Sequence, residues 1–419
     1  MANATREAIE AVWRIESARL LGGLVRTVRD VGLAEDLAQE ALVAALERWP
    51  ETGVPDNPGA WLMATARNRA IDQIRRRRML DRKHGAIEDD EAYGASPRIP
   101  DIETAIDEGV GDDVLRLVLV ACHPVLSTEA RVALTLRLLG GLTTDEIARA
   151  FFLPEPTIAQ RIVRAKRTLT EARVPFEVPR GADLRVRLPS VLEVIYLIFN
   201  EGYAATRGDD WIRIDLCEDA LRLGRILAGL VPGEAEVHGL VALMELHSSR
   251  MRARLGPSGE PILLLDQDRS RWDQLLIHRG LAALARAESL ARPLGPYALQ
   301  AAITACHARA RTAGATDWAR IVALYDALVE ITRSPVVALN RAVAVGMAFG
   351  PAAGLDLVDE LADEPSLRAY HLLPAVRGDL LEKLGRTDEA RVEFERAARL
   401  AGNTRERALL LSRAKAPSN

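Results

Sequence analysis

The sequence predicts an all-α protein made of several helical domains. Almost every segment carries apolar residues at helical spacing, and the alternating pattern of strands is nearly absent. The 419 residues are too many for one small core. Charge is strongly segregated along the chain, and Pro- and Gly-rich stretches separate the blocks. We expect a first helical block at 1–84, a linker at 85–111, a second block at 112–174 and a large helical region at 175–419.

The composition is typical of a soluble globular protein, with 48% hydrophobic and 27% charged residues. No run of eighteen apolar residues occurs, so no membrane span is expected. The N-terminus lacks the apolar core of a signal peptide, and three separated cysteines give no disulfide framework. These features predict a cytoplasmic protein.

The first block ends in a basic helix that contains four consecutive arginines, Arg75 to Arg78. Leu62, Ala66, Ala70 and Ile74 recur every fourth residue and form one apolar stripe. Residues 60–83 carry eight basic and two acidic side chains, mostly on the other faces. Such a surface suits a nucleic-acid partner.

The linker at 85–111 reverses the charge, with eight carboxylates against Arg98 alone. It is broken by prolines and nearly lacks aromatic residues, which is typical of a flexible tether. A tether that imitates nucleic acid inside a basic channel is the second interpretation.

The second block contains a predicted helix-turn-helix at 142–166. Thr143 or Thr144 caps a short helix that buries Ile147, Ala148 and Phe151, and a turn follows at Phe152 and Leu153. Pro156 suits the first turn of the next helix, which buries Ile158, Ile162 and Val163. An ordinary helix pair of a bundle is the alternative, which the exposed side chains disfavour.

The exposed face of this second helix has the side chains that read DNA. Arginine forks onto guanine and glutamine onto adenine, whereas lysine mainly holds phosphate. The expected DNA contacts are Thr157, Gln160, Arg161, Arg164 and Lys166.

The end of the chain repeats itself. Gly314, Gly350 and Gly385 stand 36 and 35 positions apart, close to the tetratricopeptide period of about 34 residues. Phe394 and Ala397 are expected on the second helix of the last unit. Stacked helical hairpins are predicted, with a plain helical bundle as the alternative.

Other signals are weak. Cys122-His123 and Cys306-His307 lack the spacing of a metal site, and Asp266 to Asp273 departs from a calcium loop and favours a helix cap. Asn200 to Tyr203 is either a ligand patch or a polar turn. We expect no metal, no cofactor and no catalytic site.

The segments Ala34–Trp49 and Pro58–Asp72 resemble the second conserved region of sigma-70-family factors, most closely the extracytoplasmic-function (ECF) group. The helix-turn-helix resembles their fourth region, in the right order and at the right separation. The long tail resembles the subgroup with a tetratricopeptide-like C-terminal extension.

The resemblance implies a docking site for core RNA polymerase. In the family, the helix corresponding to Asp36, Leu37, Gln39 and Glu40 binds the clamp helices of the largest subunit, and the flap of the second subunit is a further partner. These residues suggest a surface patch in which Leu37 supplies burial and the charges set orientation.

The resemblance also implies that the basic helix lies against the minus-ten promoter element and the helix-turn-helix on the minus-thirty-five element. The loop Glu51–Asn57 would help to form a pocket for a flipped base. The family usually has glycine near the position of Phe152, and a bulky phenylalanine does not easily adopt a positive φ. The turn, and with it the orientation of the recognition helix, is therefore expected to differ from the family. The expected minus-ten contacts are Trp61, Arg67, Asn68, Arg69, Asp72, Gln73, Arg75 and Arg76.

The sequence therefore predicts a transcription initiation factor that performs no chemistry itself. The tail would regulate it, by holding the two blocks or by receiving a protein or small ligand. The alternatives are a helix-turn-helix regulator with a tetratricopeptide-like sensor, and an enzyme housed in the tail.

Overall fold

The computed structural model describes residues 2–83, 110–151, 153–179, 181–205, 212–257 and 259–415. The all-α prediction is confirmed. Within these ranges the backbone is helical apart from turns, loops and isolated bridge residues, which include the antiparallel bridge between Leu255 and Pro261. None of the helices described is both long and apolar enough to span a membrane.

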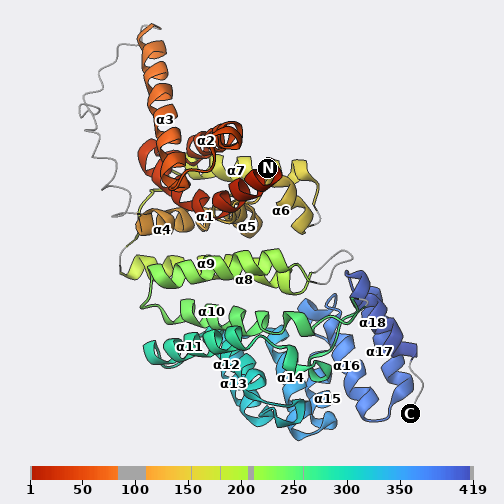
Figure 1. The fold of residues 1–419 in the computed structure, drawn as a ribbon. Coiled ribbons are helices and arrows are strands. Elements are labelled where there is room, and N and C mark those ends of the chain that lie inside the picture. The colour runs from red at the N-terminus through yellow and green to blue at the C-terminus, as the bar shows by residue number, and fades with distance from the viewer. Residues whose placement is uncertain are drawn as a thin grey trace. The chain divides into compact units, whose positions relative to one another are not determined.

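The chain divides into two compact units (Figure 1). Residues 1–149 and 153–194 form the first, and residues 150–152 and 195–419 form the second. Most of the expected acidic linker at 85–111 lies outside the described residues, so its role stays a prediction.

The first unit contains most of the two blocks predicted from the sequence. Asp30 caps one of its helices by accepting a hydrogen bond from the Leu33 amide (2.7 Å), and Asn57 caps the next through the Ala60 amide (3.0 Å). Its elements are α1 (Ala2–Val28), α2 (Val31–Thr52), α3 (Pro58–Lys83), α4 (Val110–Ala121), α5 (Thr128–Thr135), the π-helix η2 (Leu136–Gly140), α6 (Thr144–Phe151), α7 (Glu155–Glu171) and the first part of α8 (Ala182–Tyr203).

The two blocks pack against each other within this unit. Helix α1 lies on α4 and η2 as well as on α2 and α3. At Gly22 of α1, a Cβ atom would come within 2.9 Å of the Asp113 carbonyl group, so the close approach of α1 and α4 needs glycine there.

The second unit continues the helical chain. Asp273 caps α11 by accepting from the Leu276 amide (3.1 Å), which confirms the helix-cap interpretation of the Asp266–Asp273 segment. Asn200 to Tyr203 form the last turn of α8 and are not a separate turn. The further elements are α9 (Ile214–Leu230), α10 (Ala235–Ser248), η3 (Met251–Ala253), η4 (Leu264–Asp266), η5 (Arg269–Arg271), α11 (Gln274–Leu290), α12 (Pro296–Arg309), η6 (Ala313–Ala315), α13 (Trp318–Thr332), α14 (Pro335–Phe349), α15 (Pro351–Glu360), η7 (Pro365–Leu367), α16 (Leu372–Lys383), α17 (Thr387–Leu400) and α18 (Thr404–Lys415).

The last six helices form three consecutive pairs, and each pair begins shortly after Gly314, Gly350 or Gly385. Each of these helices packs mainly on the next one along the chain (Figure 1), as stacked hairpins require. Phe394 and Ala397 lie on α17, the first helix of the last pair, so their predicted place on a second helix is wrong. Helix α17 runs without a break from Thr387 to Leu400, so both residues belong to the helix that directly follows Gly385.

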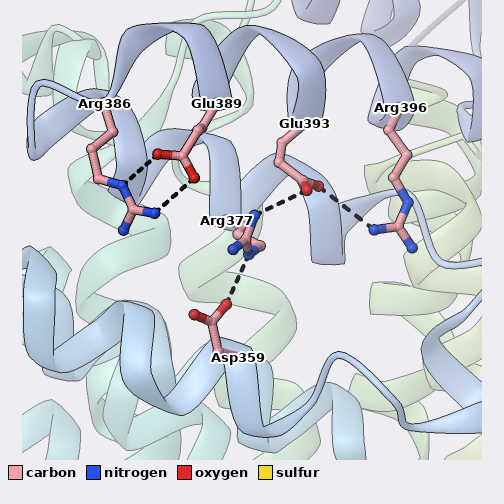
Figure 2. A network of polar contacts seen from close by, with 6 residues as sticks. All are labelled: Asp359, Arg377, Arg386, Glu389, Glu393 and Arg396. Atoms are coloured by element: carbon pink, nitrogen blue, oxygen red, sulfur yellow. Dashed lines mark hydrogen bonds and ion pairs between the residues drawn. The ribbon is translucent and has the colours of Figure 1, made fainter.

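Ion pairs join successive helices of this array (Figure 2). Arg377 of α16 donates to Asp359 of α15 (2.8 Å) and to Glu393 of α17 (3.0 Å). The hydrogen bond with Asp359 raises the pKa of the Arg377 guanidinium. One side chain therefore connects three consecutive helices at a half-buried position.

Candidate promoter and polymerase interface

Helices α6 and α7 form the predicted helix-turn-helix. The Thr143 hydroxyl accepts from the Glu146 amide (3.2 Å), and the Glu146 carboxylate accepts from the Thr143 amide (2.7 Å). This reciprocal capping box confirms Thr143 as the cap. After α6, the Leu153 amide donates to the Ala148 carbonyl (3.0 Å), which closes the turn before Pro156 enters the first turn of α7. Phe152 lies outside the described residues.

The buried face of α7 differs from the prediction at one position. Ile158 and Ile162 are buried as expected, but Val163 is 63% exposed and Ala165 is buried instead. At 100° per residue, Ile158, Ile162 and Ala165 share one face, whereas Val163 is turned about 100–160° away from them. In α6, Ile147 and Ala148 are buried, whereas Phe151 is only half-buried.

The predicted base-reading residues lie together along a shallow groove of about 380 Å³ in the first unit. Thr157, Gln160 and Arg164 are exposed, and Arg161 is half-exposed. Ser127 and Ala130, near the start of α5, line the other side. The described part of α7 thus presents an amide and two guanidinium groups on one accessible surface.

Helix α3 carries the predicted minus-ten residues, and the structure separates them into groups. Trp61 packs edge-on against the buried Trp49, with ring centroids 5.3 Å apart. Asn68 is exposed, and Arg69 is half-exposed and pairs with Glu40 of α2 (3.1 Å). The backbone of Asp72, Gln73, Arg75 and Arg76 is helical, but their side chains lie outside the described residues.

Arg67 is half-buried. Burial lowers the pKa of its guanidinium, the charge of Arg26 lowers it further, and Asp113 of α4 opposes both. Arg67 thus lies near the second block in this structure, whereas the sequence analysis predicted that it contacts minus-ten DNA.

The loop before α3 is shorter than the expected Glu51–Asn57. Helix α2 continues through Pro50 to Thr52 and ends at Gly53, whose φ of +82° is left-handed. Residues 53–57 therefore form the connection, and Glu51 belongs to the helix.

The proposed docking patch on α2 is only partly a surface. Asp36 and Glu40 are exposed and Gln39 is half-exposed, but Leu37 is 1% exposed. The prediction of Leu37 as a surface anchor is therefore wrong for this structure. Leu37 continues the buried face formed by Ala34, Ala38 and Ala41, which helical spacing brings to one side.

Three sequence families match this chain. Residues 15–79 match Sigma-70 region 2, residues 116–169 match Sigma-70, region 4, and residues 187–288 match a family of unknown function, DUF6596. The RNA polymerase sigma-H factor of Pseudomonas aeruginosa is 31% identical over 160 residues, which cover 38% of this chain and 82% of that factor. The chain belongs to the sigma-70 family.

Other relatives place this sigma factor in the ECF group and extend the match beyond the two regions. The probable ECF RNA polymerase sigma factor SigI of Mycobacterium tuberculosis is 30% identical over 175 residues, which cover 41% of this chain and 58% of SigI. An uncharacterized protein of Rhizobium meliloti is 43% identical over 391 residues, covering 93% of this chain and 91% of the relative. No solved structure matches. The chain is thus a promoter-directing sigma factor with a large C-terminal helical extension.

A buried acidic residue of region 2 joins the sigma factor's two regions. Glu35 of α2, which is 6% exposed, accepts from Arg137 of η2 (2.6 Å) and pairs with Lys166 of α7. Burial acts to raise the pKa of Glu35, but Lys166 and Arg137 outweigh it and the pKa is lowered. Lys166 was predicted to hold DNA phosphate, and here it is bound to region 2.

Asp113 makes the reciprocal contact from region 4. This buried carboxylate on α4 pairs with Arg26 of α1 (3.2 Å) and with Arg116 of its own helix (2.6 Å). Glu35 therefore lies between two basic side chains of region 4, whereas Asp113 pairs with one basic side chain of region 2 and one of its own helix. Sequence reasoning missed both acids because neither belongs to a promoter- or polymerase-binding motif.

Leu37→Ala should lower the free energy of unfolding of the sigma factor by about 2–5 kcal/mol, the usual cost of truncating a buried leucine. Chemical denaturation monitored by circular dichroism measures this loss. Val43→Ala, at a half-exposed position of the same helix, is the matched control and should change stability little. Equal stabilities of the Leu37 variant and the wild type would contradict the buried position.

Proposed function

We propose that this sigma factor docks on core RNA polymerase through the exposed face of α2 and reads the minus-thirty-five element through α7. Region 2 would contact the clamp helices of the largest subunit, and region 4 the flap of the second. Helix α3 would assist opening of the minus-ten element. The observation that carries this proposal is the exposed row Thr157, Gln160 and Arg164 on α7 of a matched region 4. Phosphodiester synthesis is the polymerase's reaction, and we assign this chain no catalytic step.

The packed pair of regions is, in this proposal, the inactive state. Lys166 is engaged by Glu35 of the opposite region and is unavailable to phosphate. Arg67 is half-buried beside Arg26 and Asp113. Core polymerase and promoter would have to separate regions 2 and 4 before both contact DNA. The C-terminal unit would regulate that step, with a protein or small ligand as its effector.

Run-off transcription with purified core polymerase tests the proposal. The full chain, added to core polymerase and genomic fragments, should produce discrete transcripts that core polymerase alone does not make. A chain that binds promoter fragments but yields no transcript with core polymerase would be a regulator and not an initiation factor.

Asp36→Arg should weaken association with core polymerase by at least tenfold without changing the helix content. The substitution reverses a charge on the exposed face of α2, where complementary charge sets docking. Co-purification with core polymerase measures the loss. Glu47→Arg makes the same charge change at an exposed position of the same helix and should leave association unchanged. Equal effects of the two variants would reject the patch.

Arg164→Ala should cost about 1–3 kcal/mol of minus-thirty-five binding and relax the preference at one base pair. Lys166→Ala, measured in a Glu35→Gln background that frees the lysine, should instead weaken all sequences alike and reduce the salt slope by about 0.9. Binding to a panel of single-base variants across a salt series separates the two effects. A uniform loss from Arg164→Ala would show that Arg164 does not read a base.

A further inference from the structure

The second unit contains a buried cluster of basic and aromatic side chains that the sigma-factor function does not use. We call it the arginine–histidine cluster. Arg250 and Arg254 are only 7% and 5% exposed. Its members come from the ends of α8, α10 and α12 and from the segment between α10 and α11; they are Tyr203, His247, Arg250, Arg254, Arg269, Trp272 and His307.

The guanidinium groups of Arg250 and Arg269 meet only neutral partners in the described part of the chain. Arg250 donates to the Tyr203 hydroxyl (2.7 Å) and lies 2.8 Å from His247 Nδ1. It also lies over the rings of Tyr203 and Trp272. Arg269 donates to the His307 and Ala310 carbonyls (2.6 and 2.7 Å), contacts the Thr316 hydroxyl and lies over Trp272.

Arg254 adds a third positive charge beside them. Its guanidinium carbon is 3.6 Å from the centroid of the Tyr203 ring, and it donates to the Tyr203 carbonyl. Burial lowers the pKa of Arg254 and so does the charge of Arg250, whereas the Tyr203 hydroxyl opposes them. Arg250 and Arg269, which meet only neutral partners among the described residues, are unfavourably placed this close to each other without a counter-charge.

Three buried donors or acceptors of the cluster have no hydrogen-bond partner among the described residues. They are Nε of Arg250, Nε1 of Trp272 and Nδ1 of His307, and each side chain belongs to a residue more than nine-tenths buried. Buried polar atoms of this kind are rarely left unsatisfied in a folded protein. Their presence beside the arginines indicates that a ligand completes the cluster.

Helix capping and cation–π contact account for only part of this arrangement. Arg269 satisfies carbonyls at the end of α12, and such a basic side chain stabilises a helix C-terminus. The aromatic faces favour Arg250 and Arg254. Neither effect explains the free Nε of Arg250 or the neighbouring ring nitrogens.

The arginines carry the positive charge of the cluster, because the two histidines are neutral near pH 7. Burial, followed by the charges of Arg250 and Arg269, lowers the pKa of His307 to about 4. Burial and the nearby arginines also lower the pKa of His247 well below its usual value. Near neutral pH both rings are therefore uncharged, and the nitrogen that carries the proton can donate to an acceptor.

We propose that the arginine–histidine cluster binds one small oxyanion, the phosphate or carboxylate group of a metabolite. Guanidinium groups bind both oxyanions with paired, charge-assisted hydrogen bonds. The indole and imidazole nitrogens offer further donors to the same acceptor. Because the donors are buried, the site suits a compact ligand and not an extended acidic peptide. Six of the seven members lie within residues 187–288, the segment that matches the family of unknown function. In this proposal, that segment would bind the oxyanion.

Isothermal titration calorimetry on the full chain tests the site without polymerase or promoter. Inorganic phosphate and succinate are the two probes, titrated at constant ionic strength with sodium chloride as the balancing salt. At least one should bind saturably at a stoichiometry near one per chain. Tighter binding of phosphate points to a phosphorylated ligand, and tighter binding of succinate to a carboxylated one.

Arg250→Met should reduce the association constant of the bound anion by at least tenfold. Arg252→Met is the matched control, because it removes the same charge two positions away at an exposed side chain, and it should bind normally. If Arg250→Met does not fold, Arg250→Lys is the second variant. It keeps the charge but loses the paired N–H donors of the guanidinium group, and it should still weaken anion binding severalfold. Thermal unfolding with each anion is the second readout, since a general salt effect stabilises all variants equally.

The proposal is wrong if neither anion binds the wild type, or if the Arg250 and Arg252 variants lose affinity equally. Asp209 and Asp210 lie in a segment outside the described residues, so Asp209→Asn with Asp210→Asn is included. Unchanged anion binding in that double variant is expected. Binding that occurs only in the double variant would overturn the proposal, because it would show that the chain's own carboxylates serve the cluster.

Discussion

Glu35→Gln is expected to separate regions 2 and 4 of the sigma factor. The carboxylate is buried between Arg137 and Lys166, and replacing it leaves two basic groups without their counter-charge. Removing one partner of a buried ion pair costs about 3–5 kcal/mol. Much of this cost falls on the contact between the regions, because the packed state alone brings Glu35 to both partners. The reciprocal Arg26–Asp113 pair remains but is half-exposed on the arginine side.

Fluorescence energy transfer between labels on α2 and α7 measures the separation. Transfer should fall in Glu35→Gln, and minus-thirty-five affinity should rise as Lys166 becomes available. Glu47→Gln, on the exposed face of α2, makes the same chemical change and should preserve the wild-type transfer. An unchanged distance in the Glu35 variant would show that the ion pairs do not hold the regions together.

Acidification provides an independent check on the same contact. The pKa of Glu35 is lowered in the packed state relative to its usual value of 4.5. The ionised Glu35 carboxylate therefore stabilises the packed state fully above about pH 4.5, and this stabilisation is lost as the pH falls through the lowered pKa. Transfer in the wild type should decrease over that acidic range, and the Glu35→Gln variant should lack this component.

Cutting the chain after Val194 is expected to abolish transcription while preserving minus-thirty-five binding. The cut removes most of the second unit but keeps the part of α8 that packs on region 4. Ser190 donates to the Cys122 carbonyl (2.6 Å), and Arg187 donates to the Leu119 carbonyl (2.8 Å). If the C-terminal unit supports the polymerase-bound state, its loss eliminates activity without affecting recognition of DNA by α7.

A cut after Arg173 should lower the stability of region 4 more than the cut after Val194 does, because it also removes this part of α8. Leu188, Val191 and Leu192 are buried, and each contributes about 1.5–3 kcal/mol of apolar burial. Region 4 should then lose stability and promoter binding together. Run-off transcription and DNA binding of both truncations, at matched concentration and salt, separate the two effects. A 1–194 chain that transcribes like the full chain would leave the C-terminal unit without the supporting role we assign to it.

The sequence by itself predicted the local architecture well. The capping residue Thr143, the turn before Pro156 and the glycines that precede the helix pairs are local signals, because helix starts and stops depend on residues a few positions apart. The periodic apolar residues on α6 and α7 likewise identified Ile147, Ile158 and Ile162 as buried. The order of the two regions predicted the family.

The tertiary structure alone decided which charged and apolar residues are available to partners. Leu37 was predicted to anchor a docking patch but is buried, and Lys166 was predicted to contact phosphate but pairs with Glu35. Glu35 and Arg137 meet although 102 positions separate them. The arginine–histidine cluster likewise gathers residues from Tyr203 to His307. Such meetings depend on how helices pack, and a helical period reports only which residues share one face of one helix.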